Sequence, residues 1–265
     1  MTFNGFKKGI TMDTEEVKST SIPLIISDGC CVHFGNAPAL ESVNFAINKG
    51  KKVAVVGPNG GGKSTLFNAI AGLVPLSDGS LTIEGKTPEE SKGTVSYVPQ
   101  KDLINWNFPL SVKQVVEMGL VNRKSINLFS RKKINEKIKK ALNDVGLLHK
   151  IDESIKSLSG GQLQRVMIAR ALAQDSDILL LDESFSAVDI GAQEDIMQLI
   201  NSINLDGKTI LIATHDVNNL EGKFDEVLCL NKHCCAYGDP SEVLTEEVIE
   251  EMYGSHNNLI HRERQ

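Results

Sequence analysis

The sequence predicts an α/β fold built on a parallel β-sheet, with a helical segment inserted into it. Apolar, strand-like runs alternate along the chain with helical patterns, which is typical of α/β sheets. Two runs, "DILLLDE" and "KTILIATHD", are continuously apolar, as expected for parallel strands covered on both faces. Residues 101–174 are mostly helical in pattern, so we expect a subdomain that projects from the sheet.

The expected elements can be placed in chain order. Residues 1–22 lack sustained periodicity and are expected to form a loose tail. Helices are expected over 64–73, within 101–174, over about 191–203, and at the start of an acidic C-terminal stretch that frays by 255–265. Strands are expected at 23–34, 43–47, 51–57, 80–85, 93–100, 177–183, 208–216 and 225–231.

Composition narrows the function classes. The chain has 265 residues and a net charge of −6, so nucleic acid is not expected as the main partner, because phosphate neutralisation needs a basic face. No signal-peptide pattern opens the sequence, and no run of eighteen apolar residues could span a bilayer. A membrane role would therefore come through a partner protein.

The pattern of the five cysteines does not predict a set of disulfide bonds. Their number is odd and they include vicinal pairs, which favours a reduced, cytosolic protein. The run "HCC" at 233–235 suggests a metal site, but tetrahedral zinc needs a fuller set of ligands. We therefore interpret the cysteines as small apolar residues in or beside strands, namely Cys30, Cys31, Cys229, Cys234 and Cys235.

"GPNGGGKS" matches the phosphate-loop pattern GxxxxGK[ST] and lies between an apolar strand and a helix, the context this motif requires. Glycines allow backbone amides to turn inward around phosphate oxygens. Lys63 is expected to contact the β- and γ-phosphates, Ser64 to contact Mg²⁺, and Thr65 to lie beside the α-phosphate. The expected nucleotide-binding loop comprises Gly57, Pro58, Asn59, Gly60, Gly61, Gly62, Lys63, Ser64 and Thr65.

Two carboxylates close the next buried strand, in "ILLLDES". The carboxyl ends of parallel strands face the ligand crevice of such sheets. Asp182 can therefore hold Mg²⁺ or its water, and Glu183 can act as the general base for the attacking water or position that water. A second anion-binding pattern appears in "LSGGQLQR", where Ser159 and two glycines precede a helix.

Taken in order, these motifs resemble the ATP-binding cassette (ABC) ATPases over roughly residues 23–254. The loop at 57–65 is similar to Walker A, LSGGQ at 158–162 to the family signature, and Asp182 and Glu183 to the end of Walker B. Gln100 in "YVPQ" resembles the Q-loop glutamine, Asp189 in "SAVD" the D-loop, and His215 in "ATHD" the switch histidine. The resemblance implies one ATPase domain over 23–254, with a P-loop core, an antiparallel β subdomain and a helical subdomain at about 101–174.

The resemblance also explains why one chain carries two anion sites. In the family, two cassettes pack head to tail, and the signature of one completes the Walker A site of the other. A symmetric homodimer is then the simplest assembly. The expected catalytic residues are Glu183, His215 and Gln100: Gln100 would touch Mg²⁺ or water and sense nucleotide, and His215 would stabilise charge at the γ-phosphate. The residues expected to act across the dimer are Ser159, Gly160, Gly161, Gln162 and Asp189.

Two positions depart from the common family pattern. Phe34 occupies the place of the aromatic residue, more often tyrosine, that stacks on adenine; a core phenylalanine is the alternative. Ser184 replaces a proline that stiffens the turn but carries no chemistry, so little loss is expected.

The segment "NWNFPLSVKQVV" is similar to cassettes of manganese, zinc and iron importers. The resemblance implies ATP and Mg²⁺ as cofactors, a membrane permease as the direct partner, and an extracytoplasmic metal-binding protein as an indirect one. It also implies a peripheral place at the cytoplasmic face of the membrane. Manganese is favoured; a zinc, iron or siderophore importer and a non-transport iron–sulfur assembly ATPase are the alternatives. Trp106 and Phe108 would lie where the permease docks, or simply pack the subdomain.

Overall fold

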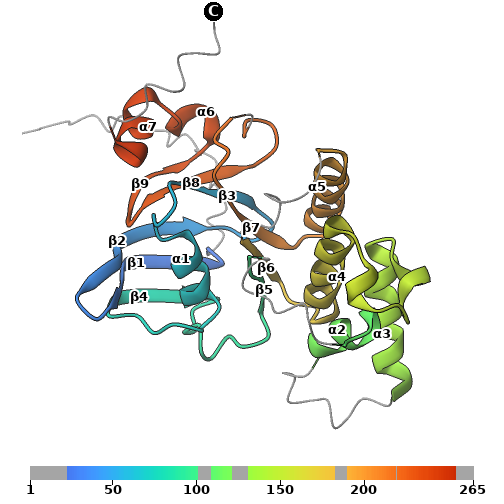
Figure 1. The fold of residues 1–265 in the computed structure, drawn as a ribbon. Coiled ribbons are helices and arrows are strands. Elements are labelled where there is room, and N and C mark those ends of the chain that lie inside the picture. The colour runs from blue at the N-terminus through green and yellow to red at the C-terminus, as the bar shows by residue number, and fades with distance from the viewer. Residues whose placement is uncertain (1–22, 101–108, 121–130, 183–189, 219, 255–265) are drawn as a thin grey trace, which may run out of the picture.

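A computed structural model describes residues 23–100, 109–120, 131–182, 190–218 and 220–254. Both expected tails lie outside these residues, as do Trp106, Phe108, Glu183, Ser184 and Asp189. The described chain forms two β-sheets with helices around them (Figure 1).

The larger sheet has six strands in the order β5-β6-β7-β3-β8-β9. All neighbouring pairs are parallel except β8 and β9, which are antiparallel. The predicted parallel sheet is therefore confirmed, with an antiparallel edge strand added. Its strands are β3 (Lys52–Val56), β5 (Val95–Val98), β6 (Ile178–Asp182), β7 (Thr209–Thr214), β8 (Glu226–Asn231) and β9 (His233–Gly238).

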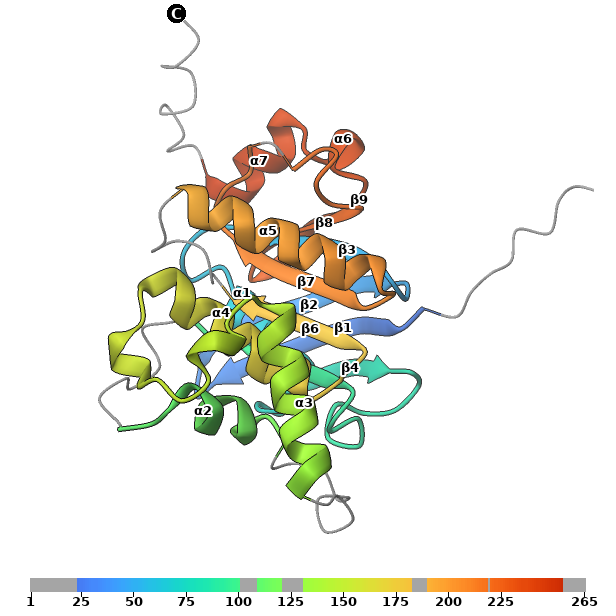
Figure 2. The same cartoon turned by 90° about the vertical axis from the view of Figure 1, so that its right-hand side faces the viewer.

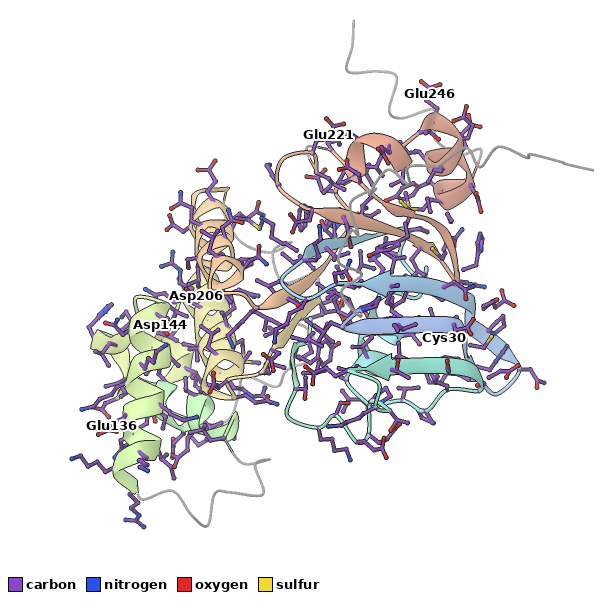
Figure 3. All side chains as sticks on the ribbon, turned by 180° about the vertical axis from the view of Figure 1, so that it is seen from behind. Cys30, Glu136, Asp144, Asp206, Glu221 and Glu246 are labelled. Carbon is purple, nitrogen blue, oxygen red and sulfur yellow. The ribbon has the colours of Figure 1, made fainter. Side chains whose placement is uncertain are left out.

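The smaller sheet is antiparallel, with the order β2-β1-β4. Its strands are β1 (Ile25–Phe34), β2 (Ala37–Ile47) and β4 (Asp78–Ile83). The expected antiparallel β subdomain is thus present, although β2 begins earlier than the alternation at 43–47 suggested. Cys30 lies on β1 (Figure 3), and its side chain is fully buried. This agrees with its prediction as a small apolar residue in a strand.

The helices are distributed around the larger sheet (Figures 1 and 2). Short 3₁₀ turns at Leu148–Lys150 and Ile155–Ser157 connect the helical segment to the signature motif. The segment expected to be helical contributes the second to fourth helices, while the exact limits of the subdomain stay a prediction. The α-helices are α1 (Lys63–Ile70), α2 (Val112–Met118), α3 (Arg131–Asp144), α4 (Gly160–Ala173), α5 (Ile190–Leu205), α6 (Pro240–Val243) and α7 (Glu246–Tyr253).

Alternation along the parallel strands divides the core between the two faces of the larger sheet. In β6, Leu180 packs with α1 and the smaller sheet, whereas Leu179 and Leu181 pack with α2, α4 and α5. In β8, Cys229 faces a third cluster that includes Met252 of α7. All five residues of β6 are buried, which confirms that its continuous apolar run reflects a strand covered on both sides.

One strand was missed by the sequence reading. His233–Gly238 forms β9 beside β8, yet its residues range only from half-buried to exposed. The run "HCCAYG" has no alternation of apolar and polar residues, so its sequence carries little strand signal. The strand exists because β8 offers it a partner.

Candidate nucleotide-binding site

The loop after β3 leads directly into α1. β3 ends at Val56 and α1 begins at Lys63, with the glycine-rich stretch between them. Gly62, at the N-cap, has a φ of 98° and no side chain that could cap the helix. The amides of the first turn can therefore donate to an anion, whose charge the helix N-terminus favours.

The loop is held against the end of β8. A Cβ added at Gly57 would lie 1.9 Å from the carbonyl oxygen of Leu230, and one at Gly61 would lie 2.9 Å from it. The Lys232 amide also donates to the Gly61 carbonyl at 2.7 Å. Glycine is therefore required at these positions by packing as well as by the approach of a phosphate. The sequence reading named neither Leu230 nor Lys232.

Lys63 is nearly buried, at 4% exposure, and its ammonium is directed at the loop itself. Its Nζ donates to the carbonyl oxygens of Gly57 at 2.8 Å and Pro58 at 3.1 Å. A lysine ammonium and the backbone amides of a glycine-rich loop together favour phosphate oxygens. The placement of this ammonium inside an amide-rich loop therefore fits a phosphate-bearing ligand.

An open pocket of about 390 Å³ lies over this loop. Its size is within the range usual for small-molecule sites. Gln100, half-buried two residues beyond β5, is brought to the loop as the resemblance implied. The residues that line the pocket are Ala39, Asn59, Gly60, Gly61, Gly62, Lys63, Ser64, Thr65 and Gln100.

Strand register brings other predicted residues to the same edge of the sheet. Val56 pairs with Thr214, and Asp182 pairs with Ala213. The chain therefore reaches Gly57, Asp182 and His215 at the carboxyl ends of adjacent parallel strands, where such sheets bind ligands. His215 is exposed at this edge.

Asp182 is fully buried at the end of β6. Its Oδ2 accepts a hydrogen bond of 2.9 Å from the hydroxyl of Tyr97 on β5. Burial and the neighbouring Asp182 carboxylate raise the pKa of Tyr97, which keeps its hydroxyl protonated as a donor. The Tyr97 ring packs edge-on against Phe67 of α1, 6.4 Å between centroids. The role of Tyr97 was not predicted, because tyrosine is common in strands and its position in the sequence gives no sign of a contact with Asp182.

The signature serine caps α4. The Ser159 hydroxyl accepts from the Gln162 amide at 3.3 Å, and the Gln162 side-chain oxygen accepts from the Ser159 amide at 3.1 Å. This reciprocal pair is a capping box. Ser159 is exposed. The described residues lining the Walker A pocket do not include those of the signature, so a single chain does not bring the two motifs together.

Phe34 lies at the end of β1 and is 56% exposed. The alternative of a core phenylalanine is therefore wrong. An exposed ring is free to present its face to a planar ligand. The predicted base Glu183 and the D-loop Asp189 lie outside the described residues, so their placement stays a prediction.

Comparisons with known proteins decide the family. The family model described as "ABC transporter" matches residues 40–186. The chain belongs to the ABC transporter family. This ABC ATPase binds ATP, and its ATP hydrolysis is coupled to transport.

Relatives of this ABC ATPase match over most of its length. It is 38% identical, over 86% of the chain and 91% of the relative, to the manganese transport system ATP-binding protein MntB of Bacillus subtilis. It is 36% identical, over 90% of both proteins, to the zinc transport system ATP-binding protein TroB of Treponema pallidum. Among solved structures, cbiO1 of Clostridium perfringens, part of the ABC transporter complex cbiONQ, has a TM-score of 0.74 at 28% identity. That match covers 87% of this chain and 94% of the other.

The described helices of this ABC ATPase include none that is both long and apolar enough to cross a bilayer.

Proposed function

We propose that this ABC ATPase is the nucleotide-binding subunit of a metal-ion importer, with manganese as the favoured cargo. The observation that carries the proposal is its similarity, over most of the chain, to ATPases named for manganese transport, with a zinc transport ATPase at nearly the same identity. The cassette does not itself touch the cargo, so kinship is the only guide to the ion. Zinc is the second candidate for the same reason.

The permease would be a separate integral membrane protein, and this subunit would lie against its cytoplasmic side. An extracytoplasmic metal-binding protein would deliver cargo to that permease. The segment around Trp106, whose similarity to importer cassettes led to the prediction, would receive the permease. No nucleic-acid partner is proposed, in keeping with the net charge of −6.

Each predicted nucleotide-binding residue has a proposed role. The Lys63 ammonium would hold the β- and γ-phosphates, and the amides of the first turn of α1 would share their charge. Phe34 would stack on adenine. Ser64, Gln100 and Asp182 offer the oxygen ligands that Mg²⁺ prefers. When bound, Mg²⁺ would neutralise phosphate charge.

Hydrolysis would use further residues from this chain and from a second copy. Glu183 would take a proton from the attacking water, and His215 would stabilise charge that develops at the γ-phosphate. Ser159, Gly160 and Gly161 of a second copy would bind the same γ-phosphate, with Asp189 linking the two sites. ADP lacks that phosphate, so these contacts differ between the two nucleotide states. A difference of this kind is what lets ATP close the dimer and hydrolysis reopen it.

Metal uptake in cells lacking this gene tests the proposal. We expect manganese uptake to fall more than zinc or iron uptake when the three are measured in parallel. Complementation with the native gene should restore uptake, and complementation with Glu183→Gln should not, although that variant should still bind ATP. Unchanged uptake of all three ions, with a loss of iron–sulfur enzyme activity, would favour the assembly ATPase instead.

A further inference from the structure

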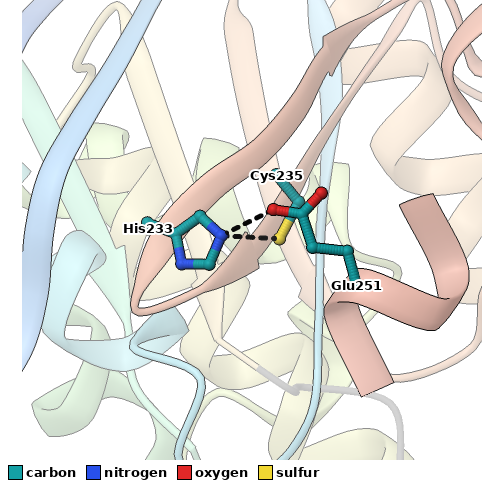
Figure 4. Close-up of side chains that lie close together, drawn as sticks. All are labelled: His233, Cys235 and Glu251. Carbon is teal, nitrogen blue, oxygen red and sulfur yellow. Dashed lines mark hydrogen bonds and ion pairs between the residues drawn. The ribbon is translucent and has the colours of Figure 1, made fainter. Parts of the chain in front are cut away.

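Three side chains of types that ligate metals lie together between β9 and α7, and none of them lines the nucleotide pocket. One ligand atom each from His233, Cys235 and Glu251 lies within 4.8 Å of the other two. The His233 Nε2 is 2.7 Å from Glu251 Oε1 and 3.7 Å from Cys235 Sγ. Figure 4 shows the imidazole, the thiol and the carboxylate converging from the strand and the helix.

An irregularity in strand pairing aims Cys235 at this group. Leu230 pairs with Cys234, but the preceding Cys229 pairs with Ala236, so Cys235 is an extra residue in β9. A bulge of this kind redirects a side chain. Cys235 and Ala236 both pack with the cluster beneath α7, whereas Cys234 packs with the cluster on the opposite face of the sheet. Two adjacent cysteines therefore have different surroundings.

Glu251 lies on α7, and this helix packs on the same face of the sheet as Cys235. Met252, next to Glu251, is fully buried against Cys229 and Val227 of β8. The N-cap of α7 is also fixed, because the Thr245 hydroxyl accepts from the Val248 amide at 3.4 Å. Glu251 remains half exposed, and so does His233. The three ligands are thus positioned by packed elements while solvent, and a dissolved ion, can reach them.

The distances suit one small ion. Zinc bonds of about 2.0–2.3 Å at tetrahedral angles place neighbouring ligand atoms about 3.3–3.6 Å apart. The imidazole–thiol separation of 3.7 Å is close to that spacing, and the imidazole and carboxylate need to part by only about half an ångström. Three protein ligands from nitrogen, sulfur and oxygen, with water in the fourth position, form a set that Zn²⁺ accepts.

We propose that His233, Cys235 and Glu251 bind one Zn²⁺, which joins β9 to α7. Thiolate and imidazole ligands select zinc over manganese, which prefers oxygen ligands and stands lower in the order of divalent affinities. Zinc binds the thiolate form of cysteine, so the bound ion displaces the Cys235 thiol proton to solvent. The proposal does not depend on which ion the transporter carries.

The test uses the full-length chain without a polyhistidine tag, stripped of metal and kept in excess Mg²⁺ to saturate sites that favour hard cations. Calorimetry with Zn²⁺ should give one ion per chain and a raised midpoint of thermal unfolding. Titration with Co²⁺ should give a thiolate-to-cobalt charge-transfer band. Cys235→Ser and His233→Ala should each weaken Zn²⁺ binding by at least about tenfold, and Cys235→Ser should abolish the band.

Neighbouring residues supply matched controls. Cys234→Ala removes the adjacent thiol, and Glu250→Gln removes the adjacent carboxylate on α7; both should bind Zn²⁺ like the native chain. The proposal is wrong if the native chain binds no stoichiometric zinc. It is also wrong if Cys235→Ser keeps the cobalt band, or if Cys234→Ala loses as much affinity as Cys235→Ser. A negative result for zinc binding would not affect the proposed transport function, which the uptake experiment tests separately.

Discussion

The hydroxyl of Tyr97 donates a 2.9 Å hydrogen bond to the buried carboxylate of Asp182, across neighbouring strands β5 and β6. Asp182 ends the strand that leads to the predicted catalytic base, and Tyr97 comes three residues before Gln100. The sheet thus orients one proposed Mg²⁺ ligand, Asp182, and links it to the strand that precedes another, Gln100. The sequence motifs named both ligands but not the tyrosine between them.

Tyr97→Phe should lower the free energy of unfolding by about 2 kcal/mol, since a hydrogen bond to a charged group is worth about 1.5–3 kcal/mol. ATPase activity should also need more Mg²⁺ for half-saturation, because Asp182 loses the donor that fixes its orientation. Urea denaturation and a Mg²⁺ titration measure the two effects. Tyr253→Phe is the control, since that hydroxyl makes only a 3.5 Å contact with the His215 carbonyl oxygen. Equal losses in both variants would contradict the role of Tyr97.

Ser159→Asp should separate helix capping from nucleotide recognition. Aspartate caps helices as well as serine does, so stability should change by less than about 0.5 kcal/mol. The added negative charge would face the γ-phosphate of a partner's ATP, so ATP-dependent dimerisation should be lost, as analytical ultracentrifugation would show. Ser111→Asp is the matched control, because Ser111 forms the same capping box with Gln114 at the start of α2. An ATP-induced dimer of Ser159→Asp as stable as the native one would refute the shared site.

Gly57→Ala should destabilise the fold through a packing clash that adds to the backbone strain of its φ of 154°. The added Cβ would lie 1.9 Å from the Leu230 carbonyl oxygen, so β8 or the loop must move. Overpacking of this kind costs about 3 kcal/mol. Gly207→Ala is the control: Gly207 has a φ of 89° but no atom within 4 Å of the added Cβ, so it should cost only the backbone strain of about 1–2 kcal/mol. Denaturation midpoints compare the two, and a smaller loss for Gly57→Ala would overturn the packing argument.

Cys229 should make the fold less stable at high pH. Burial raises the pKa of this fully buried thiol from 9.0 to about 12, so above pH 9 the unfolded chain releases a proton that the folded chain keeps. The thiol's contribution is complete below pH 9 and is lost as the pH rises toward 12. Between pH 9.5 and 11, the free energy of unfolding should fall with pH less steeply in Cys229→Ala than in the native chain, by about 1 kcal/mol per pH unit.

Cys229→Val provides the matched variant, because it also lacks the thiol but fills the space that alanine leaves. Both variants should show the same shallower slope, measured by urea denaturation with a chelator present to keep metal from the other cysteines. A native-like slope in either one would rule out titration of Cys229 as the cause.

Much of the fold could be read from local patterns. The apolar runs of β6 and β7 predicted buried parallel strands, because a strand covered on both faces has no polar side to show. The loop at 57–65 was recognisable because its glycines, lysine and hydroxyls must follow one another in a fixed order. By contrast, β9 was missed because its partner strand, not its own sequence, makes it a strand.

The sequence by itself determined the family, the order of the motifs and the residues expected around ATP, because each motif is continuous in the chain. Only the tertiary structure decided that Tyr97 supports Asp182, that Leu230 closes against the phosphate loop, and that Glu251 reaches His233 and Cys235. These contacts join segments that are distant in sequence, and no local sequence pattern predicts which of these segments meet. The packing of strands and helices alone sets which of them meet.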